Sequence, residues 1–191
     1  MIAERKAGRP RSEEVRAAIL DAAIGELQER GYAALTIEGI AARAGAGKQT
    51  IYRWWTSKAD VVLDAMLDLA AARIKIPDTG RLDTDLRGFL TDTFRQRGQR
   101  PVLVSLMAQA QLDPAFATAF REKFLFGRRA ALRSVLAAAR ERGEIAADID
   151  VELLIDVVFG VLWYRLLVDH APLDTKSARQ LSELVVRAVR S

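Results

Sequence analysis

Residues 36–58, TIEGIAARAGAGKQTIYRWWTSK, decide the architecture of this chain. The apolar residues of 37–44 recur at positions i, i+3, i+4 and i+7, which is the pattern of one helical face. Gly45 and Gly47 then mark a short break, as in the joint of a helix-turn-helix. A second short helix is predicted over residues 48–55. A short helix with a polar side and a basic start suits the major groove of DNA.

The side chains of this second helix divide into two groups. Ile51 and Trp55 form its apolar side, and its polar side carries Lys48, Gln49, Thr50, Tyr52 and Arg53. Gln can pair bidentately with adenine and Lys can reach guanine, so the start of the helix would face base edges. The Thr and Tyr hydroxyls can contact phosphate oxygens. Arg53 could contact either a base or a phosphate, and Tyr52 could instead be a core aromatic residue.

Two flanking positions are expected to add phosphate contacts. Thr36 can cap the helix at 37–44, whose positive end would then face a phosphate. Ser57 and Asp60 have the spacing of a capping box at the start of the next helix. Lys58 lies in the first turn of that helix, where the ammonium and the helix end together favour a phosphate.

The distribution of charge agrees with a nucleic-acid partner. Residues 1–58 hold 10 Lys/Arg and 7 Asp/Glu, whereas the rest of the chain holds 19 and 18. Most of the net charge of +4 therefore belongs to the helix-turn-helix segment. An ordinary solvated surface would explain the same numbers.

The composition gives little support to enzyme chemistry. The chain has no cysteine and one histidine, His170, so neither a thiolate nor a His/Cys metal cluster is expected. We find no glycine-rich phosphate loop and no nucleophile beside a base, and we predict no catalytic residue and no cofactor. The start of the chain has no apolar signal segment, and Asp156 and Arg165 interrupt its longest apolar stretch. We expect a cytoplasmic protein that does not enter a membrane.

The chain has the pattern of an all-α protein. Its five prolines fall at predicted loops or helix starts, and no strand-like alternation persists. About nine helices are expected, with Ser12 as the N-cap of the first, at residues 12–30, 37–44, 48–55, 57–74, 83–97, 101–112, 114–142, 150–169 and 175–190.

The string GYAALTIEGIAARAGAGKQTIYRWWTSKADVV, residues 31–62, resembles the TetR family of transcriptional regulators. The resemblance is close over residues 12–65, and its matching positions are Gly31, Tyr32, Thr36, Ile40, Ala41, Ala44, Gly45, Thr50, Ile51, Tyr52, Ser57 and Lys58. It implies that Lys48 and Gln49 face bases and that Thr50, Tyr52 and Lys58 contact the DNA backbone. Gly47 and Gln49 depart from the small hydroxylated or small residues that are usual at these positions.

The resemblance also implies a division of labour along the chain. Residues 1–11 would be a basic disordered arm, 12–56 a DNA-binding domain, and 57–191 a helical effector-binding and dimerisation domain. The arm contains Gly-Arg-Pro, so Arg9 and Arg11 could enter a narrow minor groove or add only nonspecific attraction.

An apolar effector pocket and a dimer interface are expected in the larger part. The predicted pocket residues are Met66, Phe89, Phe94, Met107, Gln111, Phe120, Phe124, Trp163 and Tyr164, and Arg165, Gln109 and His170 are further polar candidates. An aromatic ladder at this spacing could equally be a filled core. The helix at 150–169 is apolar nearly all round and could be a monomer core or, with 175–190, a four-helix dimer interface. The predicted interface residues are Leu154, Val158, Leu162, Leu181, Leu184 and Val185.

We therefore expect a homodimeric regulator, with repression favoured, that binds a pseudo-palindromic operator on double-stranded DNA and is released by an apolar small molecule. An activator, or an effector-independent DNA-binding or architectural dimer, would use the same parts.

Overall fold

The computed structural model of the protein describes residues 9–71, 76–95 and 99–189, and within these residues it is helical without any strand. The predicted all-α fold is therefore confirmed. The helices are α1 (Arg9–Ala34), α2 (Ile37–Ala44), α3 (Lys48–Tyr52), α4 (Lys58–Ala71), α5 (Leu82–Phe94), α6 (Arg100–Leu112), α7 (Pro114–Phe120), the π-helical turn η2 (Arg121–Leu125), α8 (Phe126–Glu141), α9 (Val151–Val168) and α10 (Thr175–Val189).

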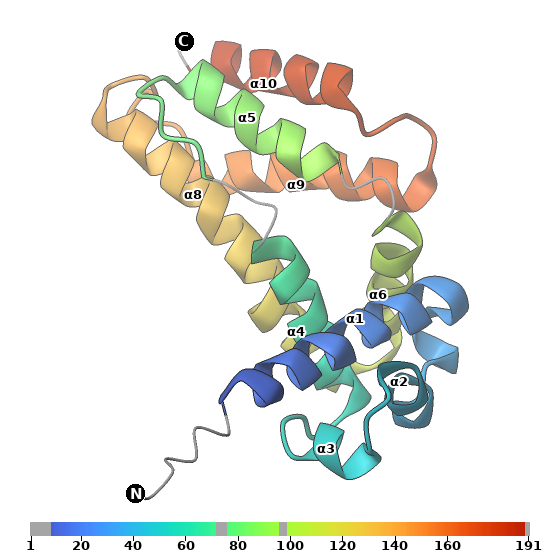
Figure 1. The fold of residues 1–191 in the computed structure, drawn as a ribbon. Coiled ribbons are helices and arrows are strands. Elements are labelled where there is room, and N and C mark those ends of the chain that lie inside the picture. The colour runs from blue at the N-terminus through green and yellow to red at the C-terminus, as the bar shows by residue number, and fades with distance from the viewer. Residues whose placement is uncertain (1–8, 72–75, 96–98, 190–191) are drawn as a thin grey trace, which may run out of the picture.

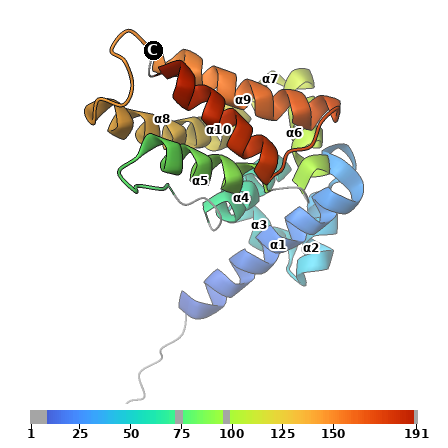
Figure 2. The ribbon, with the colours of Figure 1, turned by 90° about the horizontal axis from the view of Figure 1, so that it is seen from above.

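The helices form two groups that meet at α4 and α6 (Figure 1). The lower group contains α1, α2 and α3, and α1 packs against α2, α4 and α6. In the upper group α5 packs against α10 and α8, and α8 packs against α9. Seen from above, α1 extends away from this upper group (Figure 2).

Each group surrounds its own hydrophobic core. The first core joins α1–α4 to α6, α7 and η2, and the second joins α5, α8, α9 and α10. Trp163 and Leu173 pack against both cores. The first core therefore runs without a break across residues 56 and 57, where the sequence analysis divides the chain by function.

The local signals of the first four helices act as expected. The Thr36 hydroxyl accepts the Gly39 N–H at 3.0 Å, and Gly45 ends α2 in the left-handed region with a φ of 62°. The Asp60 N–H donates to the Ser57 hydroxyl at 3.2 Å, and that hydroxyl donates to the Asp60 carboxylate at 2.9 Å. Both predicted caps are confirmed.

Four predicted helices differ from the structure, and the simplest case is the one predicted at 83–97, which ends at Phe94. The first helix begins at Arg9, so Ser12 is not its N-cap, and after a break at Gly31, where φ is 71°, it continues for one turn to Ala34. The helix α3 ends at Tyr52 rather than residue 55, although the N–H of Trp55 still donates to the Ile51 carbonyl at 3.0 Å. The predicted helix at 114–142 is interrupted by η2. The prediction missed this π-helical turn because the apolar residues keep their four-residue spacing through it.

Candidate DNA-binding surface and ligand cavity

Helix α3 presents a polar surface over a filled core. Ile51 is fully buried and Trp55 nearly so, whereas Lys48, Gln49, Tyr52 and Arg53 are exposed. The Trp55 indole N–H donates to Asp64 of α4 at 2.8 Å and so fixes the chain that follows α3. Because Tyr52 is 55% exposed, the alternative of a core aromatic residue is wrong.

The polar side chains of α3 differ in how they are held. The Arg53 guanidinium lies over the Trp54 ring at 5.1 Å, a cation–π contact that keeps it beside the helix. Thr50 is half-buried, and Gln49 is exposed. Gly47 at the N-cap offers no side-chain hydrogen bond, so the first amide groups of α3 are not covered by a cap.

Lys48 is paired with a carboxylate of the neighbouring helix. Its ammonium donates to Glu38 of α2 at 2.9 Å, and both side chains are exposed. This hydrogen bond lowers the pKa of Glu38 and raises the pKa of Lys48. Two N–H donors of the ammonium remain, so a base or phosphate that binds Lys48 either displaces Glu38 or shares the ammonium with it.

Lys58 makes intramolecular contacts that the sequence did not predict. Its ammonium donates to the carbonyl oxygens of Tyr32 at 3.1 Å and Leu35 at 2.9 Å, and lies 4.6 Å from the centre of the Tyr32 ring. An ammonium has three N–H donors, so at most one remains for a phosphate. Lys58 thus ties the end of α1 to the start of α4.

The predicted arm is described only in part. Arg9 and Arg11 belong to the first turn of α1. Their side chains and residues 1–8 lie outside the described part of the chain, so the predicted minor-groove contact stays a prediction.

The upper group of helices encloses a cavity of about 630 Å³ against α6 and η2. Its apolar walls include Phe94, Leu103, Met107, Phe124, Phe159 and Trp163. A volume of this size is typical of sites for small organic ligands.

The cavity contains four of the nine predicted pocket residues, namely Phe94, Met107, Phe124 and Trp163. The prediction is wrong for the other five. Met66, Phe89 and Phe120 are fully buried inside packed cores, whereas Gln111 and Tyr164 are exposed and line no wall. Of the further polar candidates, Arg165 lines the cavity, but Gln109 and His170 do not.

Three arginines of the wall were missed, Arg100, Arg128 and Arg129. A charged residue in a helix is usually solvated, so its type alone gave no signal. Arg128 nevertheless continues the four-residue spacing of Phe116, Phe120 and Phe124. Its guanidinium lies 5.5 Å from the Phe124 ring centre, and burial lowers the pKa of Arg128 to about 10.

Two elements connect the cavity to the lower helices. On α6, Leu103 and Met107 line the cavity while the Ser105 hydroxyl accepts the Tyr32 N–H of α1 at 2.8 Å. On η2, Phe124 lines the cavity while Lys123 donates to Asp60 of α4 at 3.0 Å. Burial, with help from nearby Asp113 and Asp60, raises the pKa of Tyr32 to about 12.

The predicted dimer interface agrees only partly with burial. Val158, Leu181 and Val185 are buried in the second core of the same chain, so they have no surface for a partner and the prediction is wrong for them. Leu154 and Leu162 are half-buried, and Leu162 lines the cavity. Leu184 is exposed. The exposed apolar residues of α9 are Leu153, Val157, Tyr164, Leu167 and Val168. The sequence predicted none of them in the dimer interface and placed Tyr164 in the pocket.

Two kinds of feature are absent from the described residues. No helix among them is long and apolar enough to cross a membrane. No group of three His, Cys, Asp or Glu side chains among them could hold a metal ion.

Comparison with protein families assigns both parts of the chain. Residues 19–65 match the model of bacterial regulatory proteins of the tetR family. Residues 76–185, more than half of the chain, match the tetracyclin repressor-like C-terminal domain.

Individual relatives agree with this assignment. The chain is 36% identical over 178 residues to the HTH-type transcriptional regulator YdeS of Bacillus subtilis, covering 92% of this chain and 90% of that protein. It is 33% identical over 169 residues to the DNA-binding transcriptional repressor TetR of Mycobacteroides abscessus, covering 86% and 87%. The crystal structure of the TetR family transcription regulator SCO0332 superposes with a TM-score of 0.78 at 35% identity, covering 92% of this chain and 98% of that one. The chain therefore belongs to the TetR family of helix-turn-helix transcriptional regulators.

Proposed function

We propose that this protein is a homodimeric repressor that binds a pseudo-palindromic operator and releases it when a small molecule fills the cavity. The observation that carries the proposal is the exposed polar surface of α3 above buried Ile51 and Trp55. Its action on DNA would place it in the cytoplasm of a bacterial cell.

The proposed DNA contacts follow from exposure and hydrogen-bonding capacity. Gln49 and Lys48 would read base edges at the start of α3, and Arg53 would reach a base or phosphate beside them. Thr36, Thr50 and Tyr52 would donate hydroxyl protons to phosphate oxygens. Lys58 would use its one remaining donor for a phosphate, and Arg9 and Arg11 would add charge near the minor groove.

The proposed dimer interface is the exposed apolar face of α9 with Leu184 of α10. Leu153, Val157 and Tyr164 are spaced by four and seven residues and so share one helical face. Exposed apolar residues gathered on one face are typical of a surface that another protein covers. A two-fold dimer through this face would present two copies of α3 to two half-sites.

The proposed release is a shift between two conformations of the dimer. A ligand that moves α6 or η2 would also move Ser105 or Lys123, and therefore the ends of α1 and α4 that hold the DNA-binding unit. The spacing of the two α3 helices would change, and affinity for DNA would fall by the difference in ligand affinity between the two conformations.

Selection of bound fragments from random duplex DNA tests the proposal. We expect an inverted repeat, and for Gln49→Ala a loss of about 1–3 kcal/mol with relaxed preference at one position in each half-site. Gln180→Ala, an exposed glutamine on α10, is the matched control and should leave binding unchanged. Equal loss on all sequences for Gln49→Ala would contradict base reading, and recovery of no preferred sequence would favour an architectural protein.

Sedimentation tests the dimer. Val157→Asp should dissociate it, because an aspartate on the shared face would lose water without gaining a partner. Ala130→Asp, exposed on α8, should leave it intact. A Val157→Asp dimer of unchanged stability would contradict the proposed interface.

A further inference from the structure

Arg128 is the one arginine of the cavity wall without a hydrogen-bonding partner among the described residues. Its Nε atom is buried and makes no hydrogen bond, and its guanidinium lies over the face of the Phe124 ring. Burying the Nε donor without an acceptor is costly, and the side chain as a whole is half-buried. Such an arrangement is explained if an acceptor from outside the chain completes it.

The other charged groups of the wall are already paired. Arg100 donates to the Leu166 carbonyl at 2.9 Å and lies 3.4 Å from Asp169. Arg129 is bonded to Asp156.

Arg165, the fourth arginine, donates to the Pro172 carbonyl at 2.9 Å. With four arginines against two aspartates, the wall carries an excess of positive charge, and each carboxylate is already paired with an arginine other than Arg128. The field inside the cavity therefore favours an anion.

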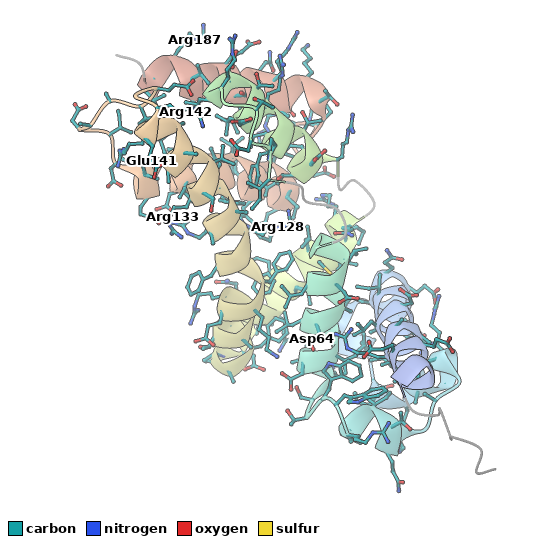
Figure 3. All side chains as sticks on the ribbon, turned by 60° about the vertical axis from the view of Figure 1, so that its left-hand side comes forward. Asp64, Arg128, Arg133, Glu141, Arg142 and Arg187 are labelled. Atoms are coloured by element: carbon teal, nitrogen blue, oxygen red, sulfur yellow. The ribbon has the colours of Figure 1, made fainter. Side chains whose placement is uncertain are left out.

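The rest of the wall is apolar apart from Thr93, whose hydroxyl donates to the Phe89 carbonyl at 2.8 Å. Phe94, Met107, Phe159 and Trp163 offer hydrophobic contact but no strong hydrogen-bond acceptor for Arg128. Figure 3 places Arg128 on α8 at the level where the upper helices meet the lower helices, so a group bound to it would lie beside both parts of the molecule. The volume of about 630 Å³ leaves room for an apolar body beside the charged group.

We propose that the cavity takes an apolar organic carboxylate, whose acid group is bound by the Arg128 guanidinium. The planar fork of the guanidinium can donate two parallel hydrogen bonds to one carboxylate. The ligand body would pack on the aromatic wall, including Phe124 of η2. This ligand would be the effector in the proposed function. Binding of the ligand does not depend on that function, and only its effect on DNA affinity rests on it.

Direct binding to the full chain without DNA tests the inference. Decanoate, 4-phenylbutyrate and 1-naphthoate serve as carboxylate probes, and 1-decanol serves as the neutral partner of decanoate. We expect decanoate to bind more tightly than 1-decanol in calorimetry below its micellar concentration. Failure of all three carboxylates to bind at millimolar concentration, or equal binding of 1-decanol, would overturn the inference.

Substitution of Arg128 sharpens the test. Arg128→Gln should weaken decanoate roughly 10- to 100-fold, as expected for loss of a charged hydrogen bond, and change 1-decanol little. Arg128→Lys should recover part of the loss, because it restores charge but not the fork. Arg165→Gln, in the same wall, is the control for the general field and should weaken decanoate by a smaller factor than Arg128→Gln. An equal loss for Arg165→Gln would assign the effect to the general field and overturn the role of Arg128.

Release of the selected operator separates this inference from the proposed function. Decanoate binding that depends on Arg128 but leaves DNA affinity unchanged would support the site and contradict the proposed release. Operator release by 1-decanol but by none of the carboxylates would support release and overturn the inference.

Discussion

The surface of α3 and the cavity both carry cations, but they hold them in opposite ways. Lys48 stands in solvent with a carboxylate partner above a filled core, whereas Arg128 is largely buried beside a void without a hydrogen-bonding partner. An exposed pair exchanges its partner at small cost, as a surface that meets many DNA sequences must. A buried donor without an acceptor is costly, so the proposed carboxylate ligand would be favoured over a neutral molecule. The difference separates a rigid reading surface from a responsive cavity.

The largest expected effect is a loss of stability, and it should differ between the filled core under α3 and the wall of the cavity. Trp55→Ala should lower the free energy of unfolding by about 3–5 kcal/mol, because Trp55 is closely packed on all sides. Trp163→Ala should cost about 1–2 kcal/mol, because Trp163 already borders the cavity and loses fewer contacts. Urea unfolding of both variants measures the contrast. Equal costs would mean that the cavity wall is as tightly packed as the support of α3.

Removal of the positive charge of Arg128 should raise the free energy of unfolding rather than lower it. Arg128→Met keeps much of the aliphatic volume and removes the charge, so the ligand-free protein should become more stable by about 1–2 kcal/mol. Arg133→Met, on the same helix, removes an arginine that is paired with Glu152 and should give no gain. Thermal unfolding of the ligand-free variants measures both. A destabilised Arg128→Met would show that the guanidinium already has a favourable place in the empty cavity.

The next effect concerns the junction between the two regions, where Lys123 meets Asp60. Hydrogen bonds from Thr56, Lys123 and Ser57 lower the pKa of Asp60 to about 2. A carboxylate with a depressed folded pKa stabilises the fold above its ordinary pKa near 4, and this stabilisation is lost as the pH falls towards 2. Asp60→Asn should therefore cost about 1 kcal/mol at neutral pH after solvent screening, and almost nothing near pH 2.

Urea unfolding across this range of pH tests the junction. Asp68→Asn, on the same helix, removes an exposed carboxylate that lies 3.6 Å from Arg16 and is the matched control. A constant difference between Asp60→Asn and the parent protein at every pH would contradict a role for the Asp60 charge.

Sequence patterns predicted the DNA-binding unit well because its determinants are local. The Thr36 cap, the left-handed Gly45 and the Ser57–Asp60 capping box each act within three residues along the chain. The partners of Lys58 could not be found in this way, because Tyr32 and Leu35 lie more than twenty residues earlier and meet it only after α1 and α4 pack together.

The cavity and the apolar face of α9 were predicted less well for the same reason. Phe120 and Phe124 have identical spacing and residue type, yet one is packed in a core and the other lines the cavity. Val157 and Val158 are adjacent in a helix that is apolar nearly all round, and only packing against α5 and α8 decides which is buried. Hydrophobicity predicts that such residues leave water, but it does not predict which neighbour covers them.

The smallest expected effect concerns the exposed ion pair between Lys48 and Glu38. Glu38→Gln removes the carboxylate that competes with DNA for Lys48, so affinity for the selected operator should rise a few-fold, and the rise should shrink at high salt. Glu183→Gln, an exposed carboxylate on α10, should change nothing. Fluorescence anisotropy at two salt concentrations measures both. If Glu38→Gln instead weakens binding, Glu38 orients Lys48 for its contact rather than competing for it, and the cations of α3 would be as firmly positioned as the wall of the cavity.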